Sequence, residues 1–310
     1  MNIAYIITAY MDSKQLSRLI ESLGEQDFFI HVDKKIDITE FVDEAKKIKK
    51  NIKFIKNRTK IGWGGYSQVN SLIELLKEVR EIGKEYDRVV CLSGTDYPIK
   101  SFEYIEDEFI ANKDRQYMNA CRISKNNNQN WRIIKYWKFD VNILNNKMLS
   151  TIYRRIYNKI ISNIYYFIGK RKKDYVIING KECDVFFGSD YWSLTYSCAM
   201  YVLDTIEKNK KMQKYFKTSF VPSELMIQTI VCNSPFSKYA NILIKNDLRY
   251  EELCSLHYEI YDKKIKVFTV DDYDEIIHSN KLFFRKAYSG ISDNLIKKIN
   301  EWDGNKNDQN

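Results

Sequence analysis

One carboxylate stands directly behind a proline turn, in the segment Pro222-Ser223-Glu224. Pro222 suits a helix start because its φ is fixed and it has no N–H to donate. Ser223 is a candidate N-cap, which would place Glu224 in the first helical turn, where the helix dipole favours the ionised form. An ionised, positioned carboxylate can act as a general base, and the simpler alternative is a glutamate that only stabilises its own helix.

The first hundred residues must build the frame that positions such a side chain. Strands are expected at 3–9, 28–32, 52–55 and 89–92, and helices at 12–23, 38–48 and 66–82. This alternation predicts an α/β fold with a mostly parallel sheet and flanking helices, where ligands bind at the carboxyl ends of the strands. Tyr10, Asp33 and the segment Ser93-Gly94-Thr95-Asp96 fall at those ends.

The second half of the chain is less regular. Helices are expected over 196–211, 223–232, 272–279 and 293–302, and a short strand over 283–285. No internal repeat and no Pro/Gly linker occurs, which favours a single domain over residues 1–302 with a basic helical insertion near 125–180. The polar tail 303–310 is expected to be disordered.

Composition narrows the class of protein. The chain has 310 residues, of which 44% are hydrophobic and 29% charged, and no apolar run approaches the roughly 20 residues of a membrane-spanning helix. The first residues lack the basic lead-in of a signal peptide. Six scattered cysteines without CxxC spacing predict reduced thiols, and the three histidines form no zinc motif.

Positive charge is concentrated in one segment. Residues 131–176 contain eleven Lys or Arg residues and two acidic ones, an excess equal to the net charge of +9 of the whole chain. Such a segment could face nucleic acid, an anionic membrane surface or a phosphorylated substrate. No nucleic-acid-binding motif accompanies it, so nucleic acid is the least favoured of these partners.

Seven segments resemble, in order and spacing, the core-2/I-branching glycosyltransferase family of β-1,6-N-acetylglucosaminyltransferases and peptide O-xylosyltransferases. They are Ile3-Ala4-Tyr5-Ile6-Ile7, Ile30-His31-Val32-Asp33-Lys34-Lys35, Trp63-Gly64-Gly65-Tyr66-Ser67, Leu92-Ser93-Gly94-Thr95-Asp96-Tyr97-Pro98-Ile99-Lys100, Gly188-Ser189-Asp190-Tyr191-Trp192-Ser193-Leu194, Pro222-Ser223-Glu224 and Leu282-Phe283-Phe284-Arg285-Lys286. Each motif is weak alone, but together they span roughly residues 3–300. The resemblance implies a GT-A-type, Rossmann-like fold, a UDP-sugar donor and inversion at the anomeric carbon.

Inverting sugar transfer is a single displacement that needs a base for the acceptor hydroxyl and positive charge on the departing diphosphate. The resemblance implies Glu224 as the base, with Arg285 and Lys286 on the diphosphate. Neighbouring residues of a strand point to opposite faces, so both cations reach one phosphate only where the chain bends. A solvated pair of cations at a strand end is the alternative.

The resemblance also implies contacts for the nucleotide. Asp33 resembles the family residue that binds the uracil ring, and an ordinary turn aspartate is the alternative. Thr8 and Tyr10 lie where the first strand would meet the nucleotide, although some members have a histidine in place of Tyr10. His31, within the second strand, is expected to be a buried, hydrogen-bonded histidine without a chemical role.

A further group is assigned to the sugar and acceptor cleft. Its members are Trp63, Asp96, Gly188, Ser189, Trp192 and Arg249. An indole such as that of Trp192 offers the flat apolar face on which sugars stack. The turn at Trp63 could instead be purely structural, and Asp96 could close an Asx turn. Near Arg249, Leu253 takes the place of a family tryptophan, so the identity of the acceptor does not carry over.

Asp272-Tyr273-Asp274 is the best candidate for an Asp-x-Asp metal site, since Mn²⁺ and Mg²⁺ prefer oxygen ligands. The segment directly precedes an apolar helical run, so helix capping explains it more simply. The family that the chain resembles works without a metal, with basic residues in its place. No metal and no other cofactor is therefore expected.

The expected function is metal-independent, inverting transfer of a sugar, with GlcNAc favoured, from a UDP-sugar to a glycan or glycolipid hydroxyl in surface polysaccharide synthesis. The alternatives are a xylosyltransferase-like enzyme and a non-catalytic protein that binds nucleotide sugars or a membrane surface. Animal members of the family are disulfide-bonded and membrane-anchored. From its sequence we expect this chain to lack both features, as a bacterial cytoplasmic version would.

Apolar side chains recur at helical spacing between residues 152 and 168, among Arg154, Arg155 and Lys159, and Lys170-Arg171-Lys172-Lys173 follow. An amphipathic helix with basic flanks can lie at an anionic membrane surface, so peripheral contact with the inner membrane surface is one hypothesis. The favoured alternative is that the apolar stripe packs on the protein's own core, because that is the commoner fate of such a stripe.

Overall fold

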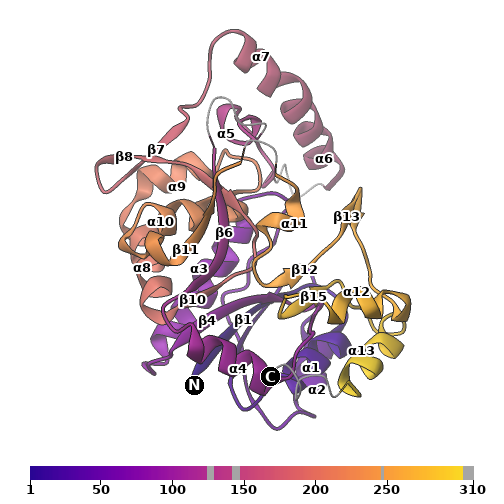
Figure 1. Ribbon diagram of the computed structural model, residues 1–310. Coiled ribbons are helices and arrows are strands. Elements are labelled where there is room, and N and C mark those ends of the chain that lie inside the picture. Colours follow the sequence, from indigo (N-terminus) through magenta and orange to yellow (C-terminus); the bar gives the residue numbers. More distant parts are fainter. Residues whose placement is uncertain (124–128, 142–146, 246–247, 303–310) are drawn as a thin grey trace.

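A computed structural model describes residues 1–123, 129–141, 147–245 and 248–302, so the polar tail 303–310 lies outside the described residues. Within them, an eight-stranded sheet has the order β11-β6-β10-β4-β1-β2-β3, with β9 also paired to β6 (Figure 1). The strands are β1 (Ile3–Ala9), β2 (Asp27–Val32), β3 (Asn51–Phe54), β4 (Arg88–Ser93), β6 (Gln116–Arg122), β9 (Phe186–Gly188), β10 (Ser193–Thr195) and β11 (Ala240–Leu243). β1 pairs in parallel with β2 and β4, whereas β9 and β10 run antiparallel to their neighbours.

Helices cover both faces of this sheet. Ile3, Tyr5 and Ile7 of β1 face a core shared with α1 (Ser13–Glu21), α2 (Thr39–Ala45) and α4 (Phe102–Ala111). Ala4 and Ile6 face the opposite core, which includes α3 (Ser67–Glu81), α8 (Tyr196–Lys208), α9 (Lys210–Phe216) and α10 (Met226–Cys232). The alternation along β1 follows from the two-residue period of a strand. The predicted α/β fold, with a mostly parallel sheet between helices, is confirmed.

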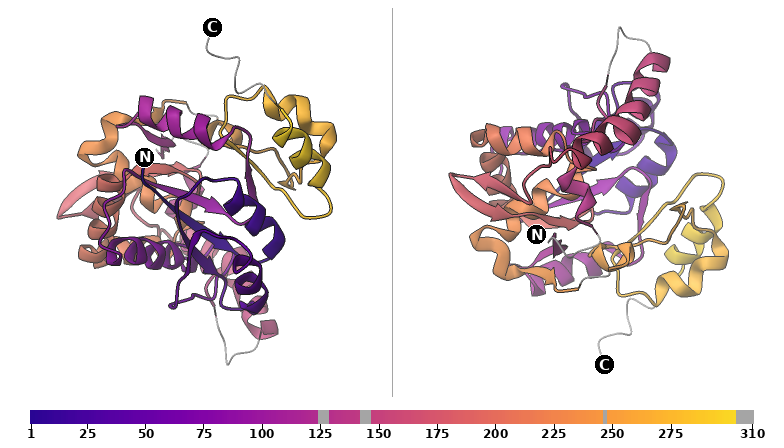
Figure 2. Two further views of the ribbon diagram at one scale, coloured as in Figure 1. Left: turned by 90° about the horizontal axis from the view of Figure 1, so that it is seen from below. Right: turned by 90° about the horizontal axis from the view of Figure 1, so that it is seen from above.

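A smaller sheet joins residues far apart in the sequence. β15 (Phe283–Arg285) lies between β12 (His257–Tyr258) and β5 (Asp96–Pro98), and Arg285 pairs with Asp96 across the antiparallel register. Helices α12 (Tyr273–Ile277) and α13 (Asp293–Asn300) pack on this sheet through a separate apolar cluster, and they lie together at one side of the molecule in Figure 2. This sheet carries the predicted Arg285 to the carboxyl end of β4.

The remaining described elements are short. They are α5 (Trp131–Ile134), α6 (Lys147–Ile156), a π-helical turn (Tyr157–Ile161), α7 (Ser162–Phe167), β7 (Tyr175–Ile178), β8 (Lys181–Asp184), α11 (Tyr250–Leu253), β13 (Tyr261–Asp262), β14 (Lys264–Ile265) and 3-10 turns at Pro222–Glu224, Pro235–Tyr239 and Val270–Asp272. The helix expected over 196–211 is broken, because the backbone of Asn209 leaves the helical region between α8 and α9.

Most isoleucines of the helical stripe between residues 152 and 168 do not pack on the core, so the favoured alternative is wrong for this side of the stripe. Tyr157 is buried, whereas Ile152, Ile156, Ile160 and Ile164 are about half exposed. Tyr157 of the π-helical turn therefore faces the protein, whereas these isoleucines face outward. Helices α6 and α7 lie at the top of Figure 1.

Two further findings concern the whole described chain. Among the described residues, no helix has both the length and the apolarity that crossing a membrane would need. No disulfide joins the six cysteines, all of which lie among the described residues, and only Cys183 is not buried.

Candidate functional site

Glu224 ends a single 3-10 turn instead of opening a helix. Val221 adopts a left-handed conformation with φ 45°, and the turn Pro222–Glu224 follows it. The Glu224 N–H donates to the Val221 carbonyl at 3.1 Å, and α10 begins only at Met226. The expected N-cap at Ser223 is wrong, because Val221 precedes the 3-10 turn and Leu225 precedes α10. Glu224 does lie in a first turn, but in that of the 3-10 helix and not of α10.

Arg132, at the start of the basic segment, holds the Glu224 carboxylate. Its Nη1 donates to Glu224 Oε2 at 3.0 Å, and each side chain is only 12% exposed. Aromatic rings of Phe187, Trp131 and Phe220 lie 3.9, 5.1 and 5.2 Å from the guanidinium carbon. The pair is thus nearly closed off from water, in surroundings that disfavour both charges.

Burial raises the pKa of Glu224 to about 8, with a further upward contribution from the Asp190 carboxylate. The charge of Arg132 lowers this pKa and Glu259 raises it again, so the ion pair offsets only part of the cost of burial. Burial likewise lowers the pKa of Arg132. The upward shift of the Glu224 pKa is opposite in direction to the one expected from a helix dipole.

Arg285 lies at the centre of a second buried ion-pair group. Its Nε is 3.2 Å from Asp96 Oδ1, and its Nη1 is 3.8 Å from Glu259 Oε2. The guanidinium also stacks on Tyr191, with 4.3 Å between its carbon and the ring centre. Burial raises the pKa of Glu259 and of Asp190, although the charge of Arg285 opposes both shifts.

Asp96 is fully buried and neither lines an open cleft nor closes an Asx turn. Its Oδ2 accepts from the Ser93 N–H at 2.7 Å and lies 2.9 Å from His257 Nε2. With Arg285 on the other oxygen, the carboxylate joins the end of β4 to β15 and β12. The structure makes Asp96 the anchor of Arg285.

The predicted nucleotide contacts gather at the carboxyl ends of β1 and β2. Asp33 is buried, and its Oδ1 accepts from the backbone N–H groups of Lys35 and Ile61 at 3.0 and 3.3 Å. The carboxylate thus closes a turn, as in the alternative interpretation of this residue. Thr8, one strand away, accepts through its carbonyl from Gly94 at 2.9 Å.

Tyr10 lies beside the loop that follows Lys286. Ser289 binds the Asp12 carboxylate through its N–H and its hydroxyl, at 2.8 and 2.6 Å, which fastens this loop to the end of β1. Burial and the neighbouring Tyr10 raise the pKa of Tyr288 to about 12. Lys286 is partly exposed, and its side chain has no hydrogen bond or ion pair to any described residue.

The predicted cleft residues separate into exposed and buried ones. Trp63 is 70% exposed and contacts Phe139 and Phe220 edge-on at 5.9 and 6.1 Å between ring centres. Trp63 is therefore available for stacking next to the residues that surround Arg132. Arg249 is also exposed, directly before α11.

The glycine turn beside Trp63 is held by Asp140, whose carboxylate accepts from the Ser67 N–H and hydroxyl at 2.7 and 2.6 Å. A Cβ at Gly65 would come within 2.1 Å of Asp140 Oδ1, so a larger residue there would displace the carboxylate that holds the turn. The segment before α6 is thereby fixed to the start of α3.

Trp192 does not line the sugar cleft. It is fully buried in the core, and its carbonyl accepts from the Cys91 N–H at 2.8 Å, which aligns the chain with β4 before β10 begins. Ser189 is 2% exposed, and a Cβ on Gly188 would lie 2.4 Å from the Asn119 carbonyl. Trp192, Ser189 and Gly188 are therefore buried beneath the surface. Their predicted position on the surface of the sugar cleft is wrong.

Asp272 takes part in helix capping, which is the simpler interpretation of the Asp272-Tyr273-Asp274 segment. Its Oδ2 accepts from the Thr269 N–H at 2.9 Å and its Oδ1 binds Lys266 Nζ. No group of three or more His, Cys, Asp or Glu side chains among the described residues is arranged to hold a metal ion. His31 is buried, and its Nε2 accepts from the Thr59 N–H at 2.8 Å, which confirms its structural role.

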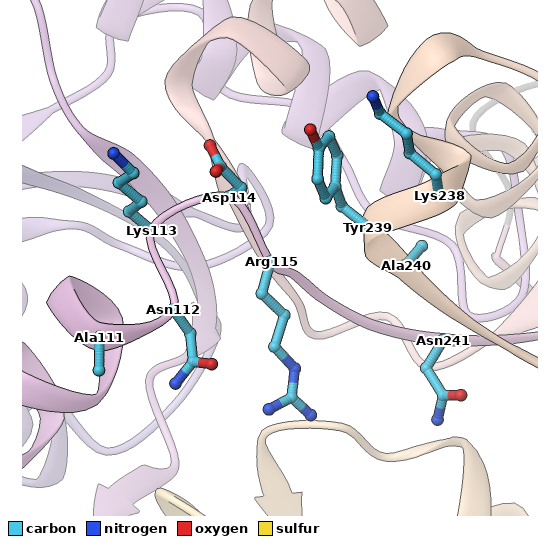
Figure 3. A pocket seen from close by; sticks show the side chains of 9 residues that line it. All are labelled: Ala111, Asn112, Lys113, Asp114, Arg115, Lys238, Tyr239, Ala240 and Asn241. Atoms are coloured by element: carbon cyan, nitrogen blue, oxygen red, sulfur yellow. The ribbon is translucent and has the colours of Figure 1, made fainter.

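Figure 3 shows an open hollow near the start of β6, lined by Lys113, Asp114, Arg115, Lys238 and Tyr239 among others. It contains none of the candidate site residues. Arg115 there already contacts the Tyr117 ring at 4.6 Å and lies 3.8 Å from the Glu108 carboxylate. The hollow is a feature of the opposite strand ends and contributes nothing to the site around Glu224.

The sequence matches the model of the Core-2/I-Branching enzyme family over residues 3–276. The chain belongs to this family. Glu224 lies inside the matched range, whereas Arg285 and Lys286 follow just beyond its end.

Among relatives, mouse xylosyltransferase 2 is 26% identical over 255 residues, covering 80% of this chain and 26% of the mouse protein. Human xylosyltransferase 2 is 25% identical with the same coverages. Xylosyltransferase oxt of Drosophila pseudoobscura pseudoobscura is 22% identical over 321 residues, which is 97% of this chain and 33% of that protein. The chain thus spans a quarter to a third of the length of these relatives.

Among solved structures, S. aureus TarS 1–349 is similar with a TM-score of 0.34 and 14% identity, over 81% of this chain and 59% of that one.

Three residues of the site were not predicted from the sequence as functional. Asp190 lies within one of the seven family-like segments. Arg132 and Glu259 lie in no such segment, because only the fold brings them to Glu224 and Arg285.

Proposed function

We propose that this Core-2/I-Branching family member transfers a sugar, with inversion and without a metal ion, from a UDP-sugar to a hydroxyl of a glycan or glycolipid acceptor in polysaccharide synthesis. The observation that carries the proposal is the Glu224 carboxylate, nearly closed off from water and 3.0 Å from Arg132. Asp190 connects this pair electrostatically with Arg285.

Glu224 is suited to take the proton of the acceptor hydroxyl. A general base works best when its pKa lies near the operating pH, and that of Glu224 is about 8. As the proton moves to the carboxylate, the acceptor oxygen forms its bond to the anomeric carbon and the bond to the diphosphate breaks. Arg132 then lies beside a neutral carboxylic acid, and UDP departs as the leaving group.

Lys286 is the stronger candidate for the departing diphosphate. Its side chain has no partner among the described residues, whereas Arg285 is committed to Asp96 and Glu259. An ammonium group binds phosphate through charge-assisted hydrogen bonds. Arg285 holds the strand from which Lys286 extends, and the exposed Trp63 offers an apolar face to the sugar or acceptor.

GlcNAc is the first candidate for the transferred sugar, in keeping with the branching enzymes of the family. Xylose is the second, because the chain aligns over 80% of its length with proteins named xylosyltransferase 2. The raised pKa of the Glu224 carboxyl beside Arg132 favours a catalytic protein over one that only binds nucleotide sugars.

The test is UDP release and product formation from UDP-GlcNAc and UDP-xylose with glycan acceptors. Glu224→Gln should lower transfer by about 10²-fold or more, the usual scale for a general base. It should still bind UDP, measured as a rise in melting temperature. The matched control is Glu182→Gln on exposed β8, which should keep full activity. Near-normal turnover in Glu224→Gln would remove this residue from the mechanism.

A further inference from the structure

An exposed row of large apolar side chains runs along the rod formed by α6, the π-helical turn and α7. The row, called the apolar ridge below, consists of Ile152, Ile156, Ile160, Ile164, Phe167 and Ile168, which are 46–79% exposed. Most follow one another every four residues, so they share one side of the rod. Single exposed apolar residues are ordinary, whereas a contiguous row marks a surface that meets another apolar phase.

The opposite side of the rod is fastened to the body of the protein. Asn158 accepts from the Lys138 N–H and donates to the Lys138 carbonyl, both at 2.9 Å. Tyr157 is buried, and the ammonium of Lys138 lies 4.5 Å from its ring centre. The rod is therefore held with its apolar ridge facing outward, and Figure 1 places it at the edge of the molecule.

The charged residues within the segment that forms the apolar ridge all have one sign. Residues 147–173 contain eight Lys or Arg residues, of which Lys172 is buried, and no Asp or Glu. Arg155 and Lys159 are exposed and directly precede Ile156 and Ile160, so they flank the ridge. Lys170, Arg171 and Lys173 are exposed just after its end. An apolar row flanked mainly by exposed cations matches the boundary of an anionic bilayer, whose interior is apolar and whose surface is negatively charged.

A second copy of the chain fits this surface poorly. In a twofold dimer the same patch faces itself, so the cations beside one ridge would meet the cations beside the other. Like charges opposed across an interface oppose association. An anionic lipid bilayer has the complementary charge and an apolar interior.

We propose that the apolar ridge lies in the headgroup–acyl boundary of an anionic lipid bilayer, with the flanking cations among the headgroups. The inference rests on the proposed function and deepens it, because it makes the acceptor a glycan carried on a membrane lipid. Lys138, which supports the rod, belongs to the segment that also carries Trp137 and Phe139. Their rings contact Phe220 at 5.0 and 5.5 Å, and Phe220 contacts Trp63. The bilayer would thus lie on the side of the protein where the acceptor is expected.

The test is co-sedimentation of the full chain with vesicles of phosphatidylcholine, alone or with about 30% phosphatidylglycerol. The protein should sediment with the anionic vesicles at about 0.05 M salt and be largely released at about 0.5 M, where charges are screened. Ile156→Ser/Ile160→Ser should lower binding at least about tenfold, because apolar burial supplies part of the affinity. Arg155→Ser/Lys159→Ser should lower it similarly, through lost attraction to the headgroups.

The control is Ile110→Ser on α4, an equally exposed isoleucine (52%) outside the ridge, which should bind as the unchanged protein does. Because all substituted side chains are exposed, each variant should keep its melting temperature and its transfer to a water-soluble acceptor. Absence of binding to anionic vesicles at low salt would overturn the inference. The inference would also be overturned if the unchanged protein were a dimer and Ile156→Ser/Ile160→Ser were a monomer.

The inference and the proposed function fail separately. Lost vesicle binding with intact transfer to a soluble acceptor removes the membrane surface and leaves the enzyme. Retained transfer in Glu224→Gln removes the proposed base, whatever the vesicles show.

Discussion

Arg132 Nη1 donates a hydrogen bond to Glu224 Oε2 at 3.0 Å, although the two residues are 92 positions apart in the chain. The arginine begins a segment that also supports the exposed rod of α6 and α7, whereas the glutamate closes the turn before α10. The pairing makes the basic segment part of the candidate active site. It also sets the proton affinity of the proposed base, because the charge of Arg132 opposes the effect of burial on Glu224.

Transfer should rise with pH through the pKa of Glu224. Only the deprotonated carboxylate accepts a proton. Because the pKa of Glu224 is about 8, kcat should increase from pH 6 and level off above about pH 8. Arg132→Leu removes a charge that lowers this pKa, so its profile should shift to higher pH. Arg132→Lys keeps the charge and should shift the profile less. The measurement is kcat at saturating substrates across pH; an unchanged profile in Arg132→Leu would refute the coupling.

Lys286→Ala should weaken UDP binding. A charge-assisted hydrogen bond to phosphate contributes about 1.5–3 kcal/mol, which corresponds to roughly 10–150-fold in Kd. Titration calorimetry with UDP measures the change. The control is Lys264→Ala in β14, an exposed lysine of the same region that should leave binding unaltered. Equal UDP affinity in both variants would exclude Lys286 from the diphosphate site.

The same enzyme should keep its activity in EDTA, since the proposal assigns the diphosphate charge to basic side chains. The assay is transfer before and after chelation, followed by addition of Mn²⁺. Asp272 is already engaged by Thr269 and Lys266 and is poorly placed to take a metal. If chelation abolishes transfer and Mn²⁺ restores it, Asp272 and Asp274 become metal-ligand candidates.

The parallel half of the fold was predictable because each of its elements is long enough to show its own period. β1 occupies residues 3–9 as expected, and Asp12 caps α1. The smaller sheet could not be foreseen as a unit. β12 and β5 have only two and three residues, and they become strands through their pairing with β15.

The site was predictable only where a local motif carried it. Glu224 and Arg285 follow from short sequence patterns, but nothing near Arg132 indicates that its side chain reaches Glu224. Trp192 shows the converse error. Its motif suggested a sugar-binding surface, and the pairing of its carbonyl with Cys91 places the ring in the core.

Asp96→Asn should destabilise the protein strongly. Asp96 is fully buried and accepts from Ser93 while it pairs with Arg285, so loss of its charge leaves the guanidinium without its 3.2 Å partner. Breaking a buried ion pair on one side typically costs about 3–5 kcal/mol. The free energy of unfolding in urea measures the loss. Asp43→Asn is the control, since Asp43 forms an exposed pair with Lys46 at 2.9 Å and should cost at most about 1 kcal/mol.

The double variant Asp96→Leu/Arg285→Met tests whether the loss of stability comes from an uncompensated buried charge. With both charges removed, no uncompensated charge stays buried, and apolar replacements of a buried ion pair are often neutral or stabilising. The double variant should therefore be more stable than Asp96→Asn and still bind UDP less well, because Arg285 holds the strand end from which Lys286 extends. Equal stability of Asp96→Asn and the unchanged protein would show that the ion pair does not hold this joint.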